Sequence, residues 1–405
     1  GTSMKDFAEL RRVLMDRLDT ARELKDEEIL ELIDELVIQN GRGRSLLEKE
    51  ELRRELFYSV RKLDVLQDLM EDARVTEIMV NGYRNIFIER EGRLSRYEKQ
   101  FTSREKLEDV IQQIVGRCNR AVNEQNPIVD ARLENGDRVN VVMNPVALNG
   151  PILTIRKFPA EPITMQKLVR GKSLTGEAAQ FLQNLVTAGY SILIGGGTST
   201  GKTTFLNALS NYIPKNERVI TIEDSAELQI QGIENLVRME TRSAALEGMR
   251  EITMRDLIKT ALRMRPNRII IGEVRSAETV DMLQAWNTGA SGSMGTAHAN
   301  STRDMVSRLE TMVLMGLQIP LEAVRRQIAS AVDIMIHLNR LRDGMRIVEE
   351  IAEVCGMENG EVKIKPLYRF EEGEGLCQVG ELENREKLER YALPENRDMT
   401  VTNGV

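Results

Sequence analysis

The spacing of hydrophobic residues separates the chain into segments with different predicted structures. In residues 1–60, apolar side chains recur every three to four positions, as at Phe7, Leu10 and Leu14, which is the spacing of one helical face. A second helix is predicted over residues 26–39. Charges of both signs are mixed on the polar faces. We therefore interpret this N-terminal helical module either as a solvated bundle or as a docking module for a partner.

Residues 61–158 alternate predicted helices with short predicted strands, which is typical of a small α+β domain of about 100 residues. Thr102 with Glu105 forms a capping pair that predicts the start of a helix. A linker is expected over residues 159–172, because its first prolines interrupt both helix and strand. The expected strands are 77–80, 85–88, 152–155 and two that flank the Asn135-Gly136-Asp137 turn.

From residue 173 to about 370 the pattern changes to repeated strand–loop–helix units, which predict a mostly parallel α/β sheet. A hairpin is expected around Asp343-Gly344. The acidic tail, residues 371–405, is expected to be flexible. Strands are predicted at 191–194, 218–222 and 268–271, and helices at 175–189, 202–212, 253–264, 276–287 and 302–315.

Composition narrows the class of protein. The chain has 405 residues, a net charge of −7, 41% hydrophobic and 29% charged residues, which is ordinary for a globular protein of two to three domains. No apolar run is long enough to span a bilayer, and no signal peptide is recognised. The three cysteines form no CxxC pair, so a reducing, cytoplasmic compartment is expected. Few aromatic residues and an acidic balance make nucleic acid an unlikely partner.

The segment from Gly196 to Thr203 matches the GxxxxGK[ST] pattern of a phosphate-binding loop in full. An apolar strand enters it and an amphipathic helix leaves it, so a chance glycine-rich turn is disfavoured. Backbone N–H groups of such a loop point at phosphate oxygens, Lys202 reaches the β- and γ-phosphates, and the Thr203 hydroxyl binds Mg²⁺. Adenine is favoured over guanine because no NKxD motif occurs. The predicted nucleotide-binding residues here are Gly196, Gly197, Thr198, Ser199, Thr200, Gly201, Lys202, Thr203 and Thr204.

Two further predicted strands end in carboxylates. The strand from Arg268 delivers Glu273, which is expected to polarise the attacking water or to hold the water shell of the metal. Another strand ends in Glu223 and Asp224. Because parallel strands present their carboxyl ends to the same crevice, these acids are expected to converge on the same Mg²⁺ ion. The alternative is a solvated strand end for Glu273 and an acidic turn for Glu223 and Asp224.

The two histidines receive different interpretations. His298 follows a segment with glycine at every third position, so it is expected in a movable loop where its imidazole could sense the γ-phosphate. His337 lies in an alternating strand and is interpreted as structural. Arginines concentrated between residues 238 and 275 are assigned to nucleotide contacts and subunit interfaces rather than to a DNA track.

Taken together, these motifs resemble the type II/type IV secretion ATPase superfamily. Within it, the likeness is nearest to the CpaF (TadA-type) motors of tight-adherence pili, and it covers about residues 60–370. The absence of a tetracysteine element argues against the type II secretion branch. The segments that carry the resemblance are the phosphate-binding loop, Ile222–Gln229, Leu262–Arg275, Gly295–Ser301, Val75–Gly82, Asp130–Asn140 and Leu153–Phe158.

The resemblance implies a RecA-like motor domain (173–370) preceded by a small PAS-like α+β domain, with ATP held between them and six subunits in a ring. It matches Glu223 and Asp224 to the Asp box, Glu273 to the Walker B glutamate and His298 to the His box. Arg156 matches an arginine that closes over the phosphates. Arg132 and Arg138 match neighbouring basic positions, and the resemblance leaves open whether they act within one chain or between chains.

The predicted function is that of a Mg²⁺-dependent ATPase. It would power pilus assembly or protein secretion at the cytoplasmic face of the inner membrane, together with an inner-membrane platform protein. Two alternatives remain open: a RecA-like nucleic-acid translocase or helicase, and a nucleotide-dependent scaffold without sustained turnover. Extension or retraction, the pilin or other substrate, and the symmetry of the ring are left open by the residues.

Overall fold

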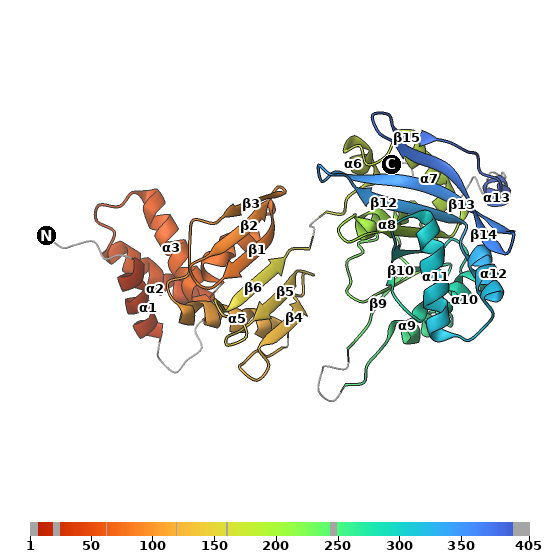
Figure 1. Ribbon diagram of the computed structural model, residues 1–405. Coiled ribbons are helices and arrows are strands. Elements are labelled where there is room, and N and C mark those ends of the chain that lie inside the picture. Colours follow the sequence, from red (N-terminus) through yellow and green to blue (C-terminus); the bar gives the residue numbers. More distant parts are fainter. Residues whose placement is uncertain are drawn as a thin grey trace. The chain divides into compact units, whose positions relative to one another are not determined.

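The computed structural model divides the chain into two compact units, residues 1–160 and 161–405, which are described separately below (Figure 1). No helix among the described residues is both long and apolar enough to cross a membrane. The structure describes residues 7–18, 25–61, 63–118, 120–158, 161–243 and 249–391.

The first unit begins with three helices around a small core of their own. The core is formed by Leu10, Ile33 and Leu56, one from each helix, all completely buried. The bounds predicted for the second helix, 26–39, are confirmed. The third helix begins where the Ser45 hydroxyl accepts the Glu48 N–H at 3.2 Å. The helices are α1 (Phe7–Leu18), α2 (Asp26–Gln39) and α3 (Leu46–Arg61).

The α+β part of this unit is a six-stranded antiparallel sheet in the order β3-β2-β1-β6-β5-β4. One face of the sheet packs against α5 (Arg104–Arg117), which contributes Leu107, Val110 and Ile111 to the core. Ser103 caps this helix, one residue later than the predicted Thr102, because the Ser103 hydroxyl accepts the Lys106 N–H. The other elements are η1 (Asp64–Leu66), α4 (Gln67–Glu71), β1 (Val75–Asn81), β2 (Ile86–Arg90), β3 (Arg93–Arg96), β4 (Ile128–Arg132), β5 (Arg138–Val142) and β6 (Ile152–Arg156).

The second unit is built on a nine-stranded sheet in the order β15-β14-β13-β12-β7-β11-β10-β8-β9. The six strands from β12 to β9 in this order run parallel, and β13, β14 and β15 extend the sheet as antiparallel strands. The strands are β7 (Ile192–Gly196), β8 (Val219–Glu223), β9 (Leu236–Glu240), β10 (Arg268–Val274), β11 (Met294–His298), β12 (Ile334–Arg340), β13 (Arg346–Glu358), β14 (Glu361–Glu371) and β15 (Gly375–Gln378).

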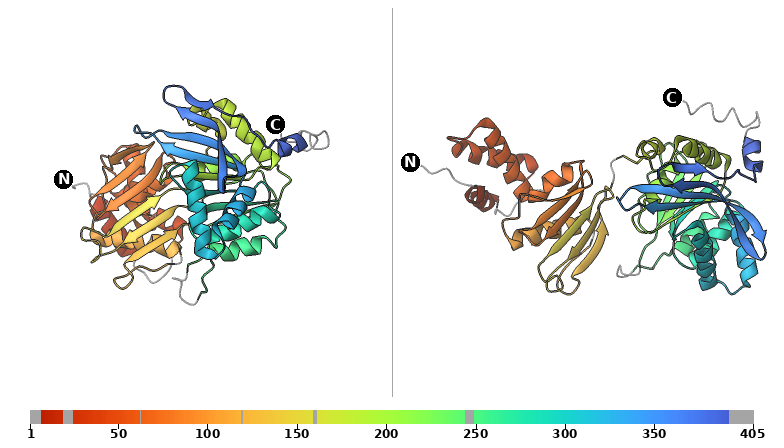
Figure 2. Two further views of the ribbon diagram at one scale, coloured as in Figure 1. Left: turned by 45° about the vertical axis from the view of Figure 1, so that its right-hand side comes forward. Right: turned by 45° about the horizontal axis from the view of Figure 1, so that its top comes forward.

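Helices cover both faces of this sheet (Figure 2). Helices α7 and α8 pack in one apolar core, and α9 to α12 pack in the other. Thr175, Thr253 and Ser301 cap α7, α9 and α11, since each side chain accepts a backbone N–H in the first turn. The helices are α6 (Met165–Arg170), α7 (Gly176–Ala188), α8 (Lys202–Ser210), α9 (Met254–Ala261), α10 (Glu278–Thr288), α11 (Thr302–Gly316), α12 (Leu321–Ala331) and α13 (Glu386–Tyr391).

Two further expectations from the sequence differ from the structure. Only the first half of the glycine-rich segment before His298, residues 289–293, lies outside regular strands and helices; the second half is the strand β11, whose residues 294–297 are buried between β7 and β10. A Cβ on Gly295 would lie 3.3 Å from the Ile271 carbonyl oxygen and 3.5 Å from the Trp286 ring, so a small residue suits this strand. Residues 371–391 do not fray: β15 pairs with β14, and Glu353 accepts the N–H groups of Glu383 and Asn384. Residues 392–405 of the predicted flexible tail lie outside the described residues.

Candidate nucleotide site

The predicted phosphate-binding loop joins β7 to α8 in the conformation that its glycines require. A Cβ on Gly196 would lie 2.5 Å from the Thr200 hydroxyl and 3.0 Å from the Leu338 carbonyl oxygen, so only glycine fits there. Thr200 closes the loop by donating to the Gly197 carbonyl at 2.8 Å. Gly201 has a φ of 89°, a left-handed conformation, directly before the first residue of α8. The loop therefore directs the N-terminus of α8, with its partial positive charge, toward the carboxyl edge of the sheet.

Lys202 and Glu273 meet at this edge. The Lys202 ammonium donates to Glu273 Oε1 at 2.9 Å and to the Gly196 carbonyl at 3.1 Å. Glu273 comes from β10, which β11 separates from β7, so tertiary folding joins positions 71 residues apart. Burial alone would raise the pKa of Glu273, but hydrogen bonds from Lys202 and Arg275 outweigh it and lower the pKa below its ordinary value. The carboxylate is thus ionised and held by two cations.

Arg275 is a site residue that the sequence interpretation did not single out. Its Nε donates to Glu273 Oε2 at 2.6 Å, and its Nη1 lies 3.9 Å from Asp224 Oδ2. Asp224 also accepts the Thr241 hydroxyl at 3.0 Å. The alternating charges Lys202, Glu273, Arg275 and Asp224 therefore form one row from the loop to the end of β8. The two-residue spacing of Glu273 and Arg275 was the signal available, because residues i and i+2 of a strand share a face.

Glu223 occupies a different environment from Asp224, although the two are adjacent. Its side chain is buried, with 3% of the residue exposed, and Oε1 accepts the N–H groups of Glu227 and Leu228 at 2.9 and 3.0 Å. Burial raises the pKa of Glu223 despite these two hydrogen bonds. A Cβ on Gly272 would lie 3.1 Å from Glu223 Cγ, so the glycine before Glu273 makes room for this carboxylate. The structure directs Glu223 inward and Asp224 toward Arg275.

His298 ends β11, where its backbone pairs in register with Gly196 of the loop. The next residue, Ala299, donates its N–H to the Gly196 carbonyl at 3.2 Å, and its carbonyl oxygen lies 3.1 Å from His337 Nε2. The other ring nitrogen of His337 faces Glu349 Oε1 at 3.1 Å. His337 is thus a buried residue that ties β12 to the segment after His298, in agreement with its structural interpretation, and exposed His298 stands at the sheet edge beside the loop.

The three arginines predicted in the first unit form a row across neighbouring strands. Arg132 on β4 pairs in register with Arg138 on β5, which pairs with Arg156 on β6. Residues that are directly opposite in a sheet share a face, so the three side chains lie on one face, opposite to the buried residues packed on α5. Glu77 continues the row on β1, and its Oε1 lies 4.0 Å from Arg156 Nε. Three adjacent guanidinium groups suit an anionic ligand.

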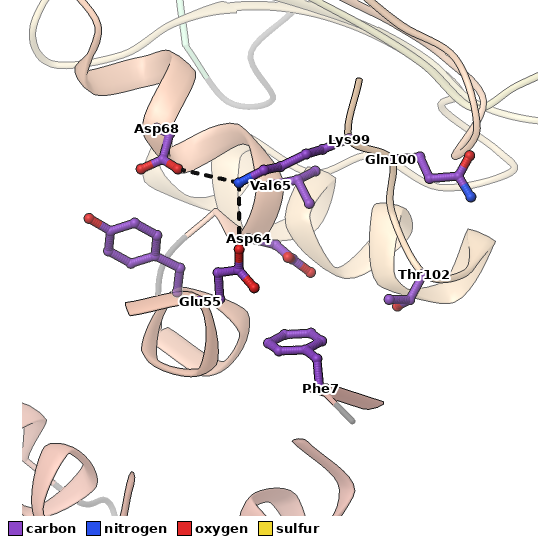
Figure 3. Close-up of a pocket in the computed structure, with 9 residues that line it drawn as sticks. Phe7, Glu55, Asp64, Val65, Asp68, Lys99, Gln100 and Thr102 are labelled. Carbon is purple, nitrogen blue, oxygen red and sulfur yellow. Dashed lines mark ion pairs between the residues drawn. The ribbon is translucent and has the colours of Figure 1, made fainter. Parts of the chain in front are cut away.

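A separate cavity of about 290 Å³ lies in the first unit (Figure 3). Lys99 extends into it between Glu55 and Asp68, at 3.5 and 3.9 Å from their carboxylates. Burial raises the pKa of Asp64 on its wall. None of the predicted nucleotide-site residues lines this cavity. The lining residues are Phe7, Glu55, Tyr58, Asp64, Val65, Asp68, Lys99, Gln100 and Thr102.

Comparison with known proteins places the chain in a family. The family described as "Type II/IV secretion system protein" matches residues 60–389. The chain belongs to this family. The match covers the α+β part and the nine-stranded sheet, and it begins after most of the N-terminal helical module.

Individual relatives are named for type IV secretion and for conjugal transfer. The chain is 32% identical over 310 residues to the type IV secretion system protein VirB11 of Brucella abortus, covering 70% of this chain and 86% of VirB11. It is 31% identical over 321 residues to the conjugal transfer protein TrbB of Rhizobium radiobacter, covering 77% of this chain and 95% of TrbB. The resemblance to the secretion superfamily is therefore confirmed, and the CpaF subtype stays a prediction.

Two solved structures share the fold. The pilus retraction motor PilT, solved with ADP, matches 84% of this chain and 89% of its own with a TM-score of 0.54 at 19% identity. The Legionella pneumophila ATPase DotB matches 70% and 78%, with a TM-score of 0.52 at 21% identity. These matches agree with an N-terminal domain followed by a RecA-like motor domain, the predicted fold class.

The residues at the loop fit a nucleoside triphosphate with Mg²⁺. Glu223 Oε2 is buried and has no hydrogen-bond partner among the described residues, as suits an oxygen that accepts from a metal-bound water. Thr203 stands in the first turn of α8, and Glu273 lies between Lys202 and Arg275 in the row of charges. Thr203, Glu223 and Glu273 would hold Mg²⁺, partly through water, with Asp224 near them through Arg275. When bound, the ion neutralises charge that develops on the phosphates.

Proposed function

We propose that this protein is an ATPase that hydrolyses ATP to drive a pilus or a secretion machine. The observation that supports this most directly is the pairing of Lys202 in the phosphate-binding loop with Glu273 at the end of β10. It brings a phosphate-binding cation and an ionised carboxylate to the carboxyl edge of a parallel sheet, where α/β proteins bind ligands.

Each residue at this edge has a proposed role. The loop, residues 196–204, positions the phosphates through backbone N–H groups, and Lys202 contacts the β- and γ-phosphates. Glu273 orients the attacking water once Lys202 has moved from it to the phosphates. Glu223 supports the water shell of the metal, and His298 senses the γ-phosphate. Positioning and electrostatic stabilisation by these groups account for most of the expected lowering of the barrier.

The proposal extends to the assembly. Relatives named for type IV secretion, conjugal transfer and pilus retraction support work at the cytoplasmic face of the inner membrane, together with a platform protein in that membrane. We propose a hexamer. In it, the row of Arg132, Arg138 and Arg156 contacts nucleotide phosphate, because guanidinium donors match phosphate oxygens and the three lie on one face of adjacent strands.

The test compares the wild-type protein with Glu273→Gln. The variant keeps the size of the side chain and an oxygen that can accept from Lys202, so it is expected to bind ATP. Loss of the carboxylate is expected to reduce turnover by about 10²- to 10⁴-fold. Phosphate release and ATP binding are measured on the same preparations. Unchanged hydrolysis in the variant would contradict the assignment of Glu273.

The same measurements address the alternatives. A scaffold would bind ATP with no sustained phosphate release even in the wild type. A nucleic-acid translocase would show hydrolysis stimulated by DNA in a strongly salt-dependent manner. The proposed motor instead hydrolyses ATP without DNA.

A further inference from the structure

The hairpin formed by β12 and β13 stands directly beside the phosphate-binding loop. Leu338 on β12 pairs in register with Gly196, and its carbonyl oxygen lies 3.0 Å from the position of a Cβ on that glycine. Beyond Leu338, the chain turns at Leu341–Gly344, closed by a hydrogen bond from the Gly344 N–H to the Leu341 carbonyl at 2.8 Å. The tip of the hairpin therefore extends from the same sheet edge as the loop.

Arg346, the first residue of β13, lies over the last glycine of the loop. Its Cδ is 3.5 Å and its Nη1 4.0 Å from the position of a Cβ on Gly201. Val348, two residues later on the same face of β13, is buried in the core that contains α7 and α8. Arg346 thus continues the α8 face of the sheet past the edge of the core, where it is exposed. Its side chain is in position to reach a ligand above Gly201 and Lys202.

The charge at this hairpin also indicates an anionic ligand. Arg340 and Arg346 are directly opposite in the β12–β13 pair, so two guanidinium side chains share one face. Two guanidinium groups on one face can both donate to the oxygens of one anion. Arg342 lies in the turn, outside this strand register. The one carboxylate of the turn, Asp343, accepts the Met345 N–H through Oδ1 at 2.9 Å.

We propose that Arg346 binds the phosphates of the nucleotide held by the loop of its own chain. A guanidinium group suits this role because its planar donors match phosphate oxygens with two parallel hydrogen bonds. The proposal rests on the proposed function, since it concerns the same nucleotide. It assigns to the β12–β13 hairpin one wall of the phosphate site.

The experiment measures the affinity of the full chain for ADP by calorimetry. Arg346→Ala is expected to weaken ADP binding by about 10- to 100-fold, the loss typical of a hydrogen-bonded charge pair. Arg346→Lys keeps the charge without the planar donors, so its ADP affinity is expected to lie between those of the wild type and Arg346→Ala. Arg342→Ala is the matched control, because it removes the same charge from the same hairpin at a position in the turn. It is expected to leave ADP affinity unchanged.

Adenosine separates phosphate contacts from contacts to the base. Its affinity is expected to be the same in the wild type and in Arg346→Ala, because adenosine carries no phosphate. Equal ADP affinity in Arg346→Ala and the wild type would overturn the inference, as would equal weakening by Arg342→Ala. A change confined to the oligomeric state would assign Arg346 to a subunit interface instead. Failure of the wild type to bind ADP would contradict the proposed function itself.

Discussion

Lys202 is paired with Glu273, and nucleotide binding has to break this ion pair. We therefore predict that the pair lowers the affinity of the protein for nucleotide. In the structure the Lys202 ammonium is hydrogen-bonded to Glu273 at 2.9 Å, and both side chains are largely buried, at 11% and 22% exposure. A nucleotide must take Lys202 away from this partner before the β-phosphate can be held. Glu273→Gln removes the charge that Lys202 leaves behind, so the variant is expected to bind ADP more tightly when no metal is present.

The expected magnitude follows from the contacts of the two groups. A hydrogen bond to a charged group contributes about 1.5–3 kcal/mol. The cost of leaving Glu273 without Lys202 is smaller than this, because Arg275 still contacts the other carboxylate oxygen at 2.6 Å. We therefore expect Glu273→Gln to make the free energy of ADP binding more favourable by about 1–1.4 kcal/mol. This corresponds to an ADP affinity about 5- to 10-fold higher in Glu273→Gln than in the wild type.

The assay is a titration of ADP in excess EDTA, which removes any contribution of Glu273 to metal binding. Asp224→Asn is the matched control: it removes a carboxylate from the same row of charges, but one that contacts Arg275 and Thr241 rather than Lys202. Only Glu273→Gln is expected to tighten binding. An unchanged or weaker ADP affinity in Glu273→Gln would refute the argument. Equally tighter ADP binding in Asp224→Asn would show that the cause is the loss of a negative charge near the site and not the contact with Lys202.

Two further predictions concern stability. Glu278 accepts the Arg275 N–H at 2.6 Å and the Ser276 N–H at 3.1 Å; burial raises its pKa but these hydrogen bonds outweigh it, so the pKa is lowered. Glu278→Gln should therefore lower the free energy of unfolding in urea by about 1–3 kcal/mol at neutral pH. This loss should disappear as the pH falls through the lowered pKa of Glu278, and a loss independent of pH would contradict the prediction. Arg268, 2% exposed, pairs with both oxygens of Glu217 at 3.1 Å. Arg268→Ala should cost about 3–5 kcal/mol in the same measurement, and a variant as stable as wild type would refute it.

Part of this fold could be predicted from local sequence. The strand, glycine-rich loop and helix from Ile192 to Ser210 follow from contiguous residues, because each backbone conformation there depends on neighbouring side chains and on glycine. Helix caps at Thr175 and Ser301 were predictable for the same reason. Local rules failed at β11, where glycine suggested a loop, because the small residue at Gly295 is set by its contacts with Ile271 and Trp286, which belong to other elements.

The sequence by itself therefore determined the chemistry of the candidate site: a phosphate-binding loop, carboxylates at strand ends and a family of secretion proteins. Only the tertiary structure decided which of those groups meet. Lys202 pairs with Glu273 across β11, while Asp224 is drawn to Arg275 and Glu223 turns inward against Gly272. The physical reason is that side-chain convergence depends on strand order and register, which are set by long-range packing. Periodicity along the chain reports only which face each residue takes.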